Sequence, residues 1–310
     1  MNKKTAVVSG ASGFIGLALV KELLISGYKV YALVRGEKKR DLPKHVDCIP
    51  IDYELDSINS VSESIPKLKN GVFFHLAWSG SVGQDRSDSD LQLKNVQWSL
   101  ESLRVAHKIG CTKFEFVSSI AEDETVAVCK TDGSSPDAHY FYGASKFASR
   151  LFLKIECTKL KMEMTCVKLA NVYGVNDFSR RMLNATLLNC LAGNSPSFTS
   201  GTQNYDFVYI SDAVLALRLI AEKGRPATEY VVGSGQPDML KNFLIKINSE
   251  FFPSLIFKFG NIPFTGVNQS LDCFSIQKTK VDTGYEPKVS FSEGVGKLVE
   301  WLKQNKNKVC

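Results

Sequence analysis

The strongest signal in this chain is Val7-Val8-Ser9-Gly10-Ala11-Ser12-Gly13-Phe14-Ile15-Gly16, in which three glycines stand three residues apart. The apolar run that begins at Thr5 predicts a buried strand, and the amphipathic segment from Phe14 predicts a helix. Gly10 then permits a tight turn, Gly13 lets the backbone approach a pyrophosphate, and Gly16 lets helix and strand pack closely. The first N–H groups of that helix would face the phosphates. A second apolar run at residues 28–34 completes a strand–helix–strand unit, so the pattern predicts a dinucleotide site.

Composition places the chain among ordinary globular enzymes. Its 310 residues are 44% apolar and 23% charged, enough for a large core in one big domain or two. The formal charge of +6 comes from scattered lysines and lacks the basic stripe that nucleic-acid binding needs. The start Met1-Asn2-Lys3-Lys4 superficially resembles a signal peptide, but residues 9–13 interrupt the apolar run that follows. We expect a cytoplasmic protein without a membrane span.

The cysteines and histidines do not indicate a metal site. The eight cysteines form no C-x-x-C pair, and several, such as Cys166, lie within apolar runs typical of strands. Buried free thiols of this kind are typical of a reducing compartment. The four histidines lack the spacing of metal ligands. We expect no bound metal.

Strand and helix patterns alternate through the first half of the chain. Apolar, β-branched runs predict strands at residues 5–8, 28–34, 46–52, 71–78, 113–119 and 162–170. Helical periodicity predicts helices at residues 14–25, 91–109 and 142–160. This alternation predicts an α/β fold with a Rossmann-like, doubly wound parallel sheet.

The second half of the chain has a different character. Turn-rich pieces flank a short helix near residues 181–191, a helix at 211–222 and a strand at 230–232 would rejoin the sheet, and 291–303 predicts a final helix. We therefore expect a dinucleotide-binding domain at residues 1–172 and 206–235. A smaller substrate-binding domain would comprise residues 173–205 and 236–310.

Tyr142-Gly143-Ala144-Ser145-Lys146 places a phenol and an ammonium four residues apart at the start of a helix, so both point to one face. A lysine cation stabilises a phenolate and lowers the pKa of the tyrosine. Such a phenol can exchange a proton with a carbonyl or alcohol oxygen while hydride moves on a nicotinamide. The preceding strand ends at Ser119, whose hydroxyl could bind the reacting oxygen at the carboxyl edge of the sheet.

The chain as a whole resembles the extended short-chain dehydrogenase/reductases, in particular their nucleotide-sugar epimerase, dehydratase and reductase branch. The motifs that carry the resemblance run from the glycine turn to the last helix: Gly10-x-x-Gly13-x-x-Gly16, His75-Leu76-Ala77, Asn95, Ser119, Tyr142/Lys146, Asn171-Val172-Tyr173-Gly174, Tyr205-Asp206-Phe207-Val208-Tyr209-Ile210 with Asp212, Gly233-Ser234-Gly235, Gly284-Tyr285-Glu286-Pro287, Phe291-Ser292-Glu293-Gly294 and Trp301-Leu302.

The resemblance implies roles for individual residues. The catalytic group would be Ser119, Tyr142 and Lys146, with Lys146 also binding the nicotinamide ribose. Substrate would meet Ser119, Tyr142, Asn171 and Tyr205. The cofactor would meet Gly10, Ser12, Gly13, Phe14, Ile15, Gly16, Arg35, Tyr142 and Lys146, with Asp52 and Tyr53 at the adenine and Leu76, Ala77 and Trp78 at the ribose and phosphates. The family also assembles as homodimers through its two long helices, here residues 91–109 and 142–160, so we expect a two-fold dimer.

Three departures from the family pattern narrow the reaction. Dehydratases of the family carry an acidic pair directly after the catalytic Ser or Thr, where this chain has Ile120 and Ala121. Epimerase-reductases of the GDP-fucose synthase type place a cysteine there and a histidine near Asn176, and neither is present. Tyr205 stands where many relatives have an arginine that reaches the substrate diphosphate, which leaves that task to Arg180, Arg181 or a lysine.

The second strand ends at Val34-Arg35-Gly36, followed by Lys38, Lys39 and Arg40. An NAD enzyme normally has an acidic residue at this point, and an arginine suits the 2′-phosphate of NADP. Ser12 adds a hydroxyl donor. The sequence favours NADP(H), and the nearby Glu37 leaves NAD(H) open.

The combined pattern predicts an NADPH-dependent oxidoreductase that reduces the keto group of a nucleotide-linked 4-keto-6-deoxy sugar. An NAD-dependent nucleotide-sugar 4-epimerase would use the same residues. An NADPH reductase of a non-sugar carbonyl is a further alternative. A non-catalytic dinucleotide sensor is disfavoured, because such proteins often lack the Tyr/Lys pair that this chain retains.

Overall fold

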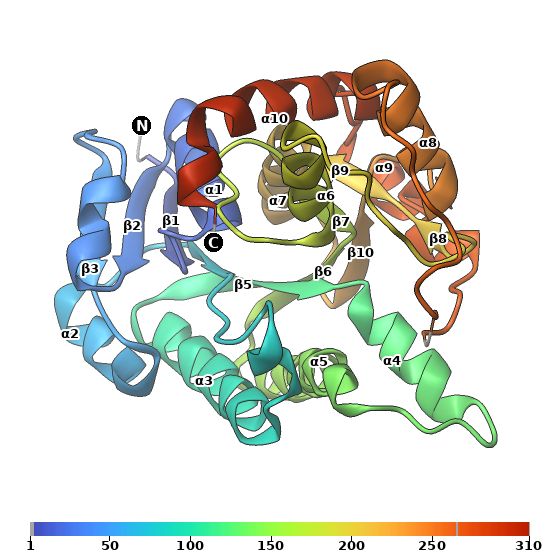
Figure 1. The fold of residues 1–310 in the computed structure, drawn as a ribbon. Coiled ribbons are helices and arrows are strands. Elements are labelled where there is room, and N and C mark those ends of the chain that lie inside the picture. Colours follow the sequence, from blue (N-terminus) through green and yellow to red (C-terminus); the bar gives the residue numbers. More distant parts are fainter. Residues whose placement is uncertain (1–2, 265, 310) are drawn as a thin grey trace.

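A parallel β-sheet forms the centre of the molecule in the computed structural model, which describes residues 3–264 and 266–309 (Figure 1). Within those residues the sheet has seven strands in the order β10-β6-β5-β4-β1-β2-β3. Their bounds are β1 Thr5–Ser9, β2 Lys29–Val34, β3 Cys48–Asp52, β4 Gly71–His75, β5 Cys111–Ser119, β6 Glu163–Leu169 and β10 Thr228–Val232. The order reverses between β1 and β4, and ligands of open parallel sheets bind beyond the strand ends at such a switch point.

Helices cover both faces of the sheet (Figure 1). On one face α3 (Ser89–Lys108) packs against α5 (Phe141–Leu160), and on the other α1 (Phe14–Ile25) packs against α7 (Ile210–Lys223). The remaining helices are α2 Val61–Ser64, α4 Ala121–Lys130, α6 Met182–Leu191, α8 Leu240–Phe251, α9 Gln277–Thr283 and α10 Phe291–Asn305. Over the described part of the chain, no helix is both long and apolar enough to cross a membrane.

Two small sheets lie in the second half of the chain. β7 (Asn171–Tyr173) pairs in parallel with β9 (Phe207–Tyr209), and β8 (Asn204–Tyr205) pairs antiparallel with β11 (Asp238–Met239). Two of the sequence motifs hold this half together. The Tyr285 hydroxyl donates to the carbonyl of Gly233 at 2.9 Å, and the Asp212 carboxylate accepts from the backbone N–H groups of Lys288 and Val289.

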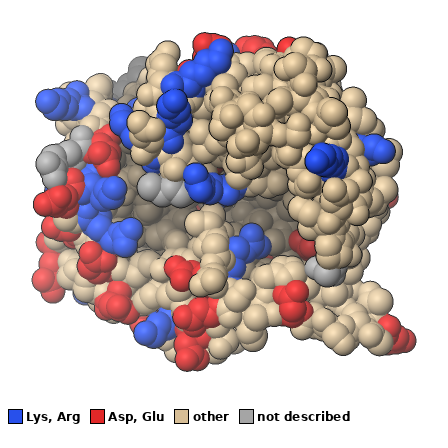
Figure 2. All heavy atoms as spheres, viewed as in Figure 1, with Lys and Arg blue, Asp and Glu red and all other residues tan. Residues whose placement is uncertain are grey.

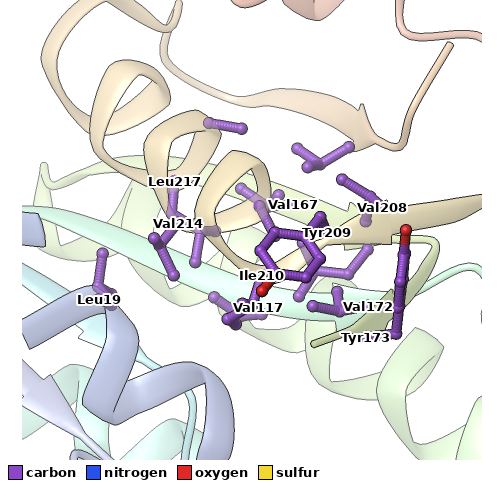
Figure 3. Packing of buried hydrophobic residues seen from close by; sticks show 14 of the residues in the cluster. Leu19, Val117, Val167, Val172, Tyr173, Val208, Tyr209, Ile210, Val214 and Leu217 are labelled. Carbon is purple, nitrogen blue, oxygen red and sulfur yellow. The ribbon is translucent and has the colours of Figure 1, made fainter. Parts of the chain in front are cut away.

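One hydrophobic cluster joins the large sheet to the second half. It includes Val117 and Val167 of the sheet, Val214 and Leu217 of α7, and Val172 of β7 (Figure 3). Burial of apolar surface stabilises by roughly 25 cal/mol per Å², so this shared core fixes the small sheets relative to the large one. The division into two domains stays a prediction.

The predicted Rossmann-like sheet is confirmed, with most element ends within two residues of the prediction. Two bounds matter for the site. β4 ends at His75, three residues earlier than predicted, so Leu76, Ala77 and Trp78 lie beyond the strand end. α4 was not predicted, and it begins directly after Ile120.

Candidate active site

A hollow crosses the middle of one face of the molecule, and Lys and Arg side chains gather at its left end and upper edge (Figure 2). In the same view, Figure 1 places α3, α4 and α5 below this hollow and α6, α7 and α10 above it. No group of His, Cys, Asp or Glu able to hold a metal occurs among the described residues. The described cysteines have free thiols, and Cys310 lies outside them.

The glycine turn has the backbone geometry that a dinucleotide site needs. Gly10 adopts φ +69°, and the N–H of Gly13 donates to its carbonyl at 3.0 Å. A Cβ on Gly16 would stand 2.1 Å from that same carbonyl oxygen, so only glycine lets α1 approach β1 this closely. Gly13 is exposed and caps α1 without a side-chain hydrogen bond. The first N–H groups of α1 therefore stay available to an anion, as the predicted phosphate site requires.

The predicted adenosine residues lie at the ends of β2 and β3. The Asp52 carboxylate accepts from the Gly36 N–H at 2.9 Å and pairs with Lys39 at 3.2 Å, and these contacts lower the pKa of Asp52. Burial raises the pKa of the Tyr53 phenol to about 12, while a hydrogen bond with the Gly10 backbone lowers it. Arg35 is exposed and makes no ion pair within the described part of the chain. The side chain of Arg40 lies outside that part. Arg35 is thus free to meet a phosphate.

His75 has a structural role next to the predicted cofactor residues Leu76 and Ala77. Its Nδ1 lies 3.0 Å from the Ser9 hydroxyl, and its Nε2 lies 3.1 Å from the Ser99 hydroxyl. Burial lowers the pKa of His75 to about 3, so the ring is neutral at physiological pH. Ser9 in turn accepts the N–H groups of Leu76 and Ala77 at 3.2 and 3.3 Å. This chain of hydrogen bonds fixes the backbone beyond β4.

The structure brings Ser119, Tyr142 and Lys146 together. Ser119 ends β5, Tyr142 lies in the first turn of α5, and Lys146 follows one turn later. Lys146 donates from Nζ to the carbonyl of Val117 at 2.9 Å. Burial raises the pKa of the Tyr142 phenol, and a hydrogen bond from Ser119 opposes this rise. The hydroxyls of Ser119 and Tyr142 therefore lie near each other, so both could reach one ligand oxygen atom.

The pKa of Lys146 and its effect on the pKa of Tyr142 both differ from expectation. Burial lowers its pKa to about 7, and its ammonium lies 3.8 Å from the centre of the Trp78 ring and 6.0 Å from that of Tyr142. The expected lowering of the Tyr142 pKa below its usual value is wrong for this structure, because desolvation of the phenol outweighs the nearby positive charges. Both groups of the Tyr/Lys pair thus have a reduced tendency to carry charge.

The first acidic residues after Ser119 stand at positions 122–124, two residues later than the pair expected for a dehydratase at 120 and 121, and two of them are engaged elsewhere. Glu122 is buried, accepts from Ser118, and pairs with Arg150 at 2.7 Å. Asp123 pairs with Lys168 at 2.9 Å. Glu124 is the exception. Burial raises its pKa, and no ion pair engages it within the described residues, so it is a free carboxyl beside the site.

The other two predicted substrate residues, Asn171 and Tyr205, lie on the small sheets. The Asn171 side chain donates from Nδ2 to the carbonyl of Asp206 at 3.1 Å, which leaves its oxygen as the group for a ligand. Tyr205 packs on Phe207 with ring centres 5.5 Å apart. Arg180 and Arg181 are exposed just before α6, and the charge of Arg181 acts on the pKa of Tyr142.

Two residues of the site were not identified from the sequence. Arg86 places its guanidinium carbon 4.4 Å from the centre of the Tyr142 ring. Burial raises the pKa of Glu124, and the nearby charges of His139 and Arg86 oppose that rise. Glu124 in turn adds to the rise in the pKa of Tyr205 that burial causes. The sequence offered only one signal for these two residues, which is that both are charged residues in segments that follow strands at the carboxyl edge of the sheet. Many loops share that pattern, so it does not identify a site by itself.

A protein-family model, described as "NAD dependent epimerase/dehydratase family", matches residues 6–233 of this chain. The chain is similar to dTDP-4-dehydro-6-deoxyglucose reductase of Escherichia coli, at 22% identity over 97% of this chain and 98% of that protein. It is also similar to dTDP-glucose 4,6-dehydratase of Haemophilus influenzae, at 22% identity over 95% and 96% of the two chains. The structure of UDP-glucose 4-epimerase with UDP-glucose from Thermotoga maritima superposes with a TM-score of 0.77 at 25% identity, covering 97% of this chain and 99% of that one.

Proposed function

Because this chain belongs to the NAD dependent epimerase/dehydratase family, we propose that it is an NADPH-dependent reductase of the keto group of a nucleotide-linked 4-keto-6-deoxy sugar. The observation that carries this proposal is the proximity of the Ser119 and Tyr142 side chains at the end of β5, with no acidic side chain at positions 120 and 121. The similar reductase from Escherichia coli, matched along nearly its whole length, supports the same reaction class.

Each residue of the catalytic group has one task in this proposal. Ser119 donates a hydrogen bond that orients the keto oxygen, and Tyr142 gives that oxygen its proton. Lys146 binds the nicotinamide ribose and stays close to Trp78. When bound, the reduced nicotinamide is the source of the hydride that the reaction consumes. Proton transfer by a positioned group of this kind contributes about two to four decades in rate.

The engagement of the acidic side chains favours reduction over dehydration. A dehydratase needs a carboxyl pair to move protons during loss of water. Here the Glu122 carboxylate is held by Ser118 and Arg150, and Asp123 is held by Lys168. Glu124 alone remains beside the site, and one carboxyl does not make the pair.

Arg35 supports NADPH as the reductant. It is exposed at the end of β2, where an acidic residue would hold the ribose diol of NAD, and Asp52 is already engaged by Gly36 and Lys39. Asn171 and Tyr205 would contact the sugar nucleotide, and Arg180 or Arg181 would pair with its diphosphate.

A nucleotide-sugar 4-epimerase is the second candidate, because the similar Thermotoga maritima protein is named as one. The same hydroxyls would serve it, with NAD in place of NADPH and no net reduction. The two candidates differ in what the purified protein retains. An epimerase keeps its dinucleotide through the catalytic cycle, whereas a reductase exchanges it every turnover.

The deciding experiment offers nucleotide-linked 4-keto-6-deoxy sugars, each with NADPH and with NADH, and identifies products by NMR. Stoichiometric oxidation of NADPH with formation of one 4-hydroxy epimer supports the reductase. Interconversion of nucleotide hexoses without consumption of added dinucleotide would instead establish the epimerase. Release of water from a nucleotide hexose would instead establish a dehydratase and would overturn both.

A further inference from the structure

Arg86 lies against the phenol ring of Tyr142. It belongs to the 3₁₀ turn Gln84–Ser87, between β4 and α3, and its guanidinium carbon is 4.4 Å from the ring centre. A cation at this distance from an aromatic face is attracted by the ring quadrupole. On another side, the Trp78 ring meets Tyr142 edge-on with ring centres 6.0 Å apart. Arg86 and Trp78 together fix the plane of the Tyr142 ring.

The loop that carries Arg86 is anchored to α3 by Gln92. The Gln92 amide donates from Nε2 to the carbonyls of Gly80 and Asp85, each at 2.9 Å, and accepts from the Trp78 indole at 2.9 Å. Gln92 is fully buried. One side chain thus positions both the Trp78 ring and the backbone next to Arg86.

The charge of Arg86 is not neutralised by a carboxylate. None of the ion pairs among the described residues includes Arg86, and its buried Nε has no acceptor there. Glu124 faces it from α4, but burial raises the pKa of Glu124 and so favours its neutral form. Arg150, by contrast, pairs with both Glu122 and Glu229.

Three charged groups act on the pKa of the Tyr142 phenol from the elements around it. Arg86 from the 3₁₀ turn and Arg181 from the start of α6 lower its pKa, and Glu122 from α4 raises it. Lys146, on the same helix, gives its hydrogen bond to Val117 instead. Arg86 lies nearer to the Tyr142 ring than Lys146 does, at 4.4 Å against 6.0 Å from the ring centre.

We propose, building on the reduction proposed above, that Arg86 is a positioning residue for Tyr142. It holds the ring at the angle that Ser119 requires, and it stabilises the phenolate left after proton transfer. In that transfer the O–H bond of Tyr142 breaks, a new O–H bond forms on the substrate oxygen that has accepted hydride at its carbon, and the phenolate then regains a proton from water.

The test is an ultraviolet titration of tyrosinate in the ligand-free protein, from which the same titration of Tyr142→Phe is subtracted to isolate one phenol. Arg86→Met removes the charge, Arg86→Lys keeps it, and Arg104→Met removes an exposed arginine that pairs with Glu156 on the outer face. We expect Arg86→Met to move the Tyr142 titration upward by roughly one to two pH units. Arg86→Lys should restore most of this shift, and Arg104→Met should not change the titration.

An unchanged titration in a folded Arg86→Met variant overturns the proposal. Thermal unfolding checks the fold, and Arg86→Gln replaces the variant if it does not fold. The titration uses no substrate, so its outcome is independent of the reaction. A titration shift without any turnover of keto sugars would support the role proposed for Arg86 and overturn the proposed function. Turnover of keto sugars with an unchanged titration would support the proposed function and overturn the role proposed for Arg86.

Discussion

The Nζ atom of Lys146 donates to the carbonyl oxygen of Val117 at 2.9 Å, which connects helix α5 to strand β5. Ser119 lies two residues beyond Val117, and Tyr142 lies one helical turn before Lys146. The bond therefore fixes the two hydroxyl-bearing residues relative to each other. It also places a buried amine, whose pKa is lowered to about 7, at the centre of the site.

Tyr142→Phe should lower kcat by about two to four decades, because it removes the proton donor and leaves the ring between Arg86 and Trp78. Dinucleotide affinity, measured by calorimetry, should stay near that of the unchanged protein. Tyr140→Phe is the matched control, since the buried Tyr140 hydroxyl has no hydrogen-bond partner among the described residues. A Tyr142→Phe enzyme with more than about a tenth of normal kcat would contradict the assignment of the proton donor.

Arg35→Ala should abolish a preference for NADPH over NADH. A charge-assisted hydrogen bond to the 2′-phosphate is worth roughly 1.5–3 kcal/mol, or about one to two decades in affinity. Fluorescence titration of both dinucleotides measures the ratio, and Lys44→Ala, an exposed charge outside the strand end, is the control. Equal affinity of the unchanged protein for both dinucleotides would refute the NADP assignment.

Replacing Phe152 and Ile155 together by glutamate should convert a dimer into a monomer. The side chains of both are more than half exposed on α5, and Leu93 is similarly exposed on α3, which packs beside it. Val96 and Leu103 of α3 are instead buried. Sedimentation velocity at micromolar concentration measures the state, with Ile25→Glu on α1 as the control for an exposed apolar residue. A monomeric unchanged protein would exclude the dimer.

Arg150→Met should destabilise the fold by about 3–5 kcal/mol at pH 8, because it leaves Glu122 as a buried carboxylate without a cation. Burial already raises the pKa of Glu122, and removal of Arg150 raises it further. A carboxyl with a raised pKa in the folded state loses stability as pH rises through that value. The loss of unfolding free energy in Arg150→Met should therefore be smaller at pH 5 than at pH 8.

Urea unfolding at the two pH values measures this deficit. Arg104→Met, which breaks the exposed pair with Glu156, should cost less than about 1 kcal/mol at either pH. An equal deficit for Arg150→Met at pH 5 and pH 8 would show that Glu122 is not the group responsible.

The sheet and the glycine turn were predictable because their signals are local. Gly10 and Gly16 occupy positions where a larger residue would clash with nearby backbone, and the strands alternate with periodic helices. α4 was missed because its residues 121–130 mix three acidic residues with short apolar ones and lack a clear apolar stripe. Arg86 was missed for another reason. Its contact with Tyr142 joins residues far apart in the sequence, and only the packing of the loop on α3 brings them together.

The position of β10 at the edge of the sheet has a consequence for how the chain folds during synthesis. β6 is paired with β5 on one side and β10 on the other, and β10 follows only after residues 170–227 have been made. Until then β6 offers an open row of backbone donors and acceptors, which is a template for pairing with another chain. Because nascent chains fold from the N-terminus, the six-stranded intermediate should be the species most exposed to aggregation, and a ribosome-bound chain that ends before Thr228 is where a chaperone has most to protect.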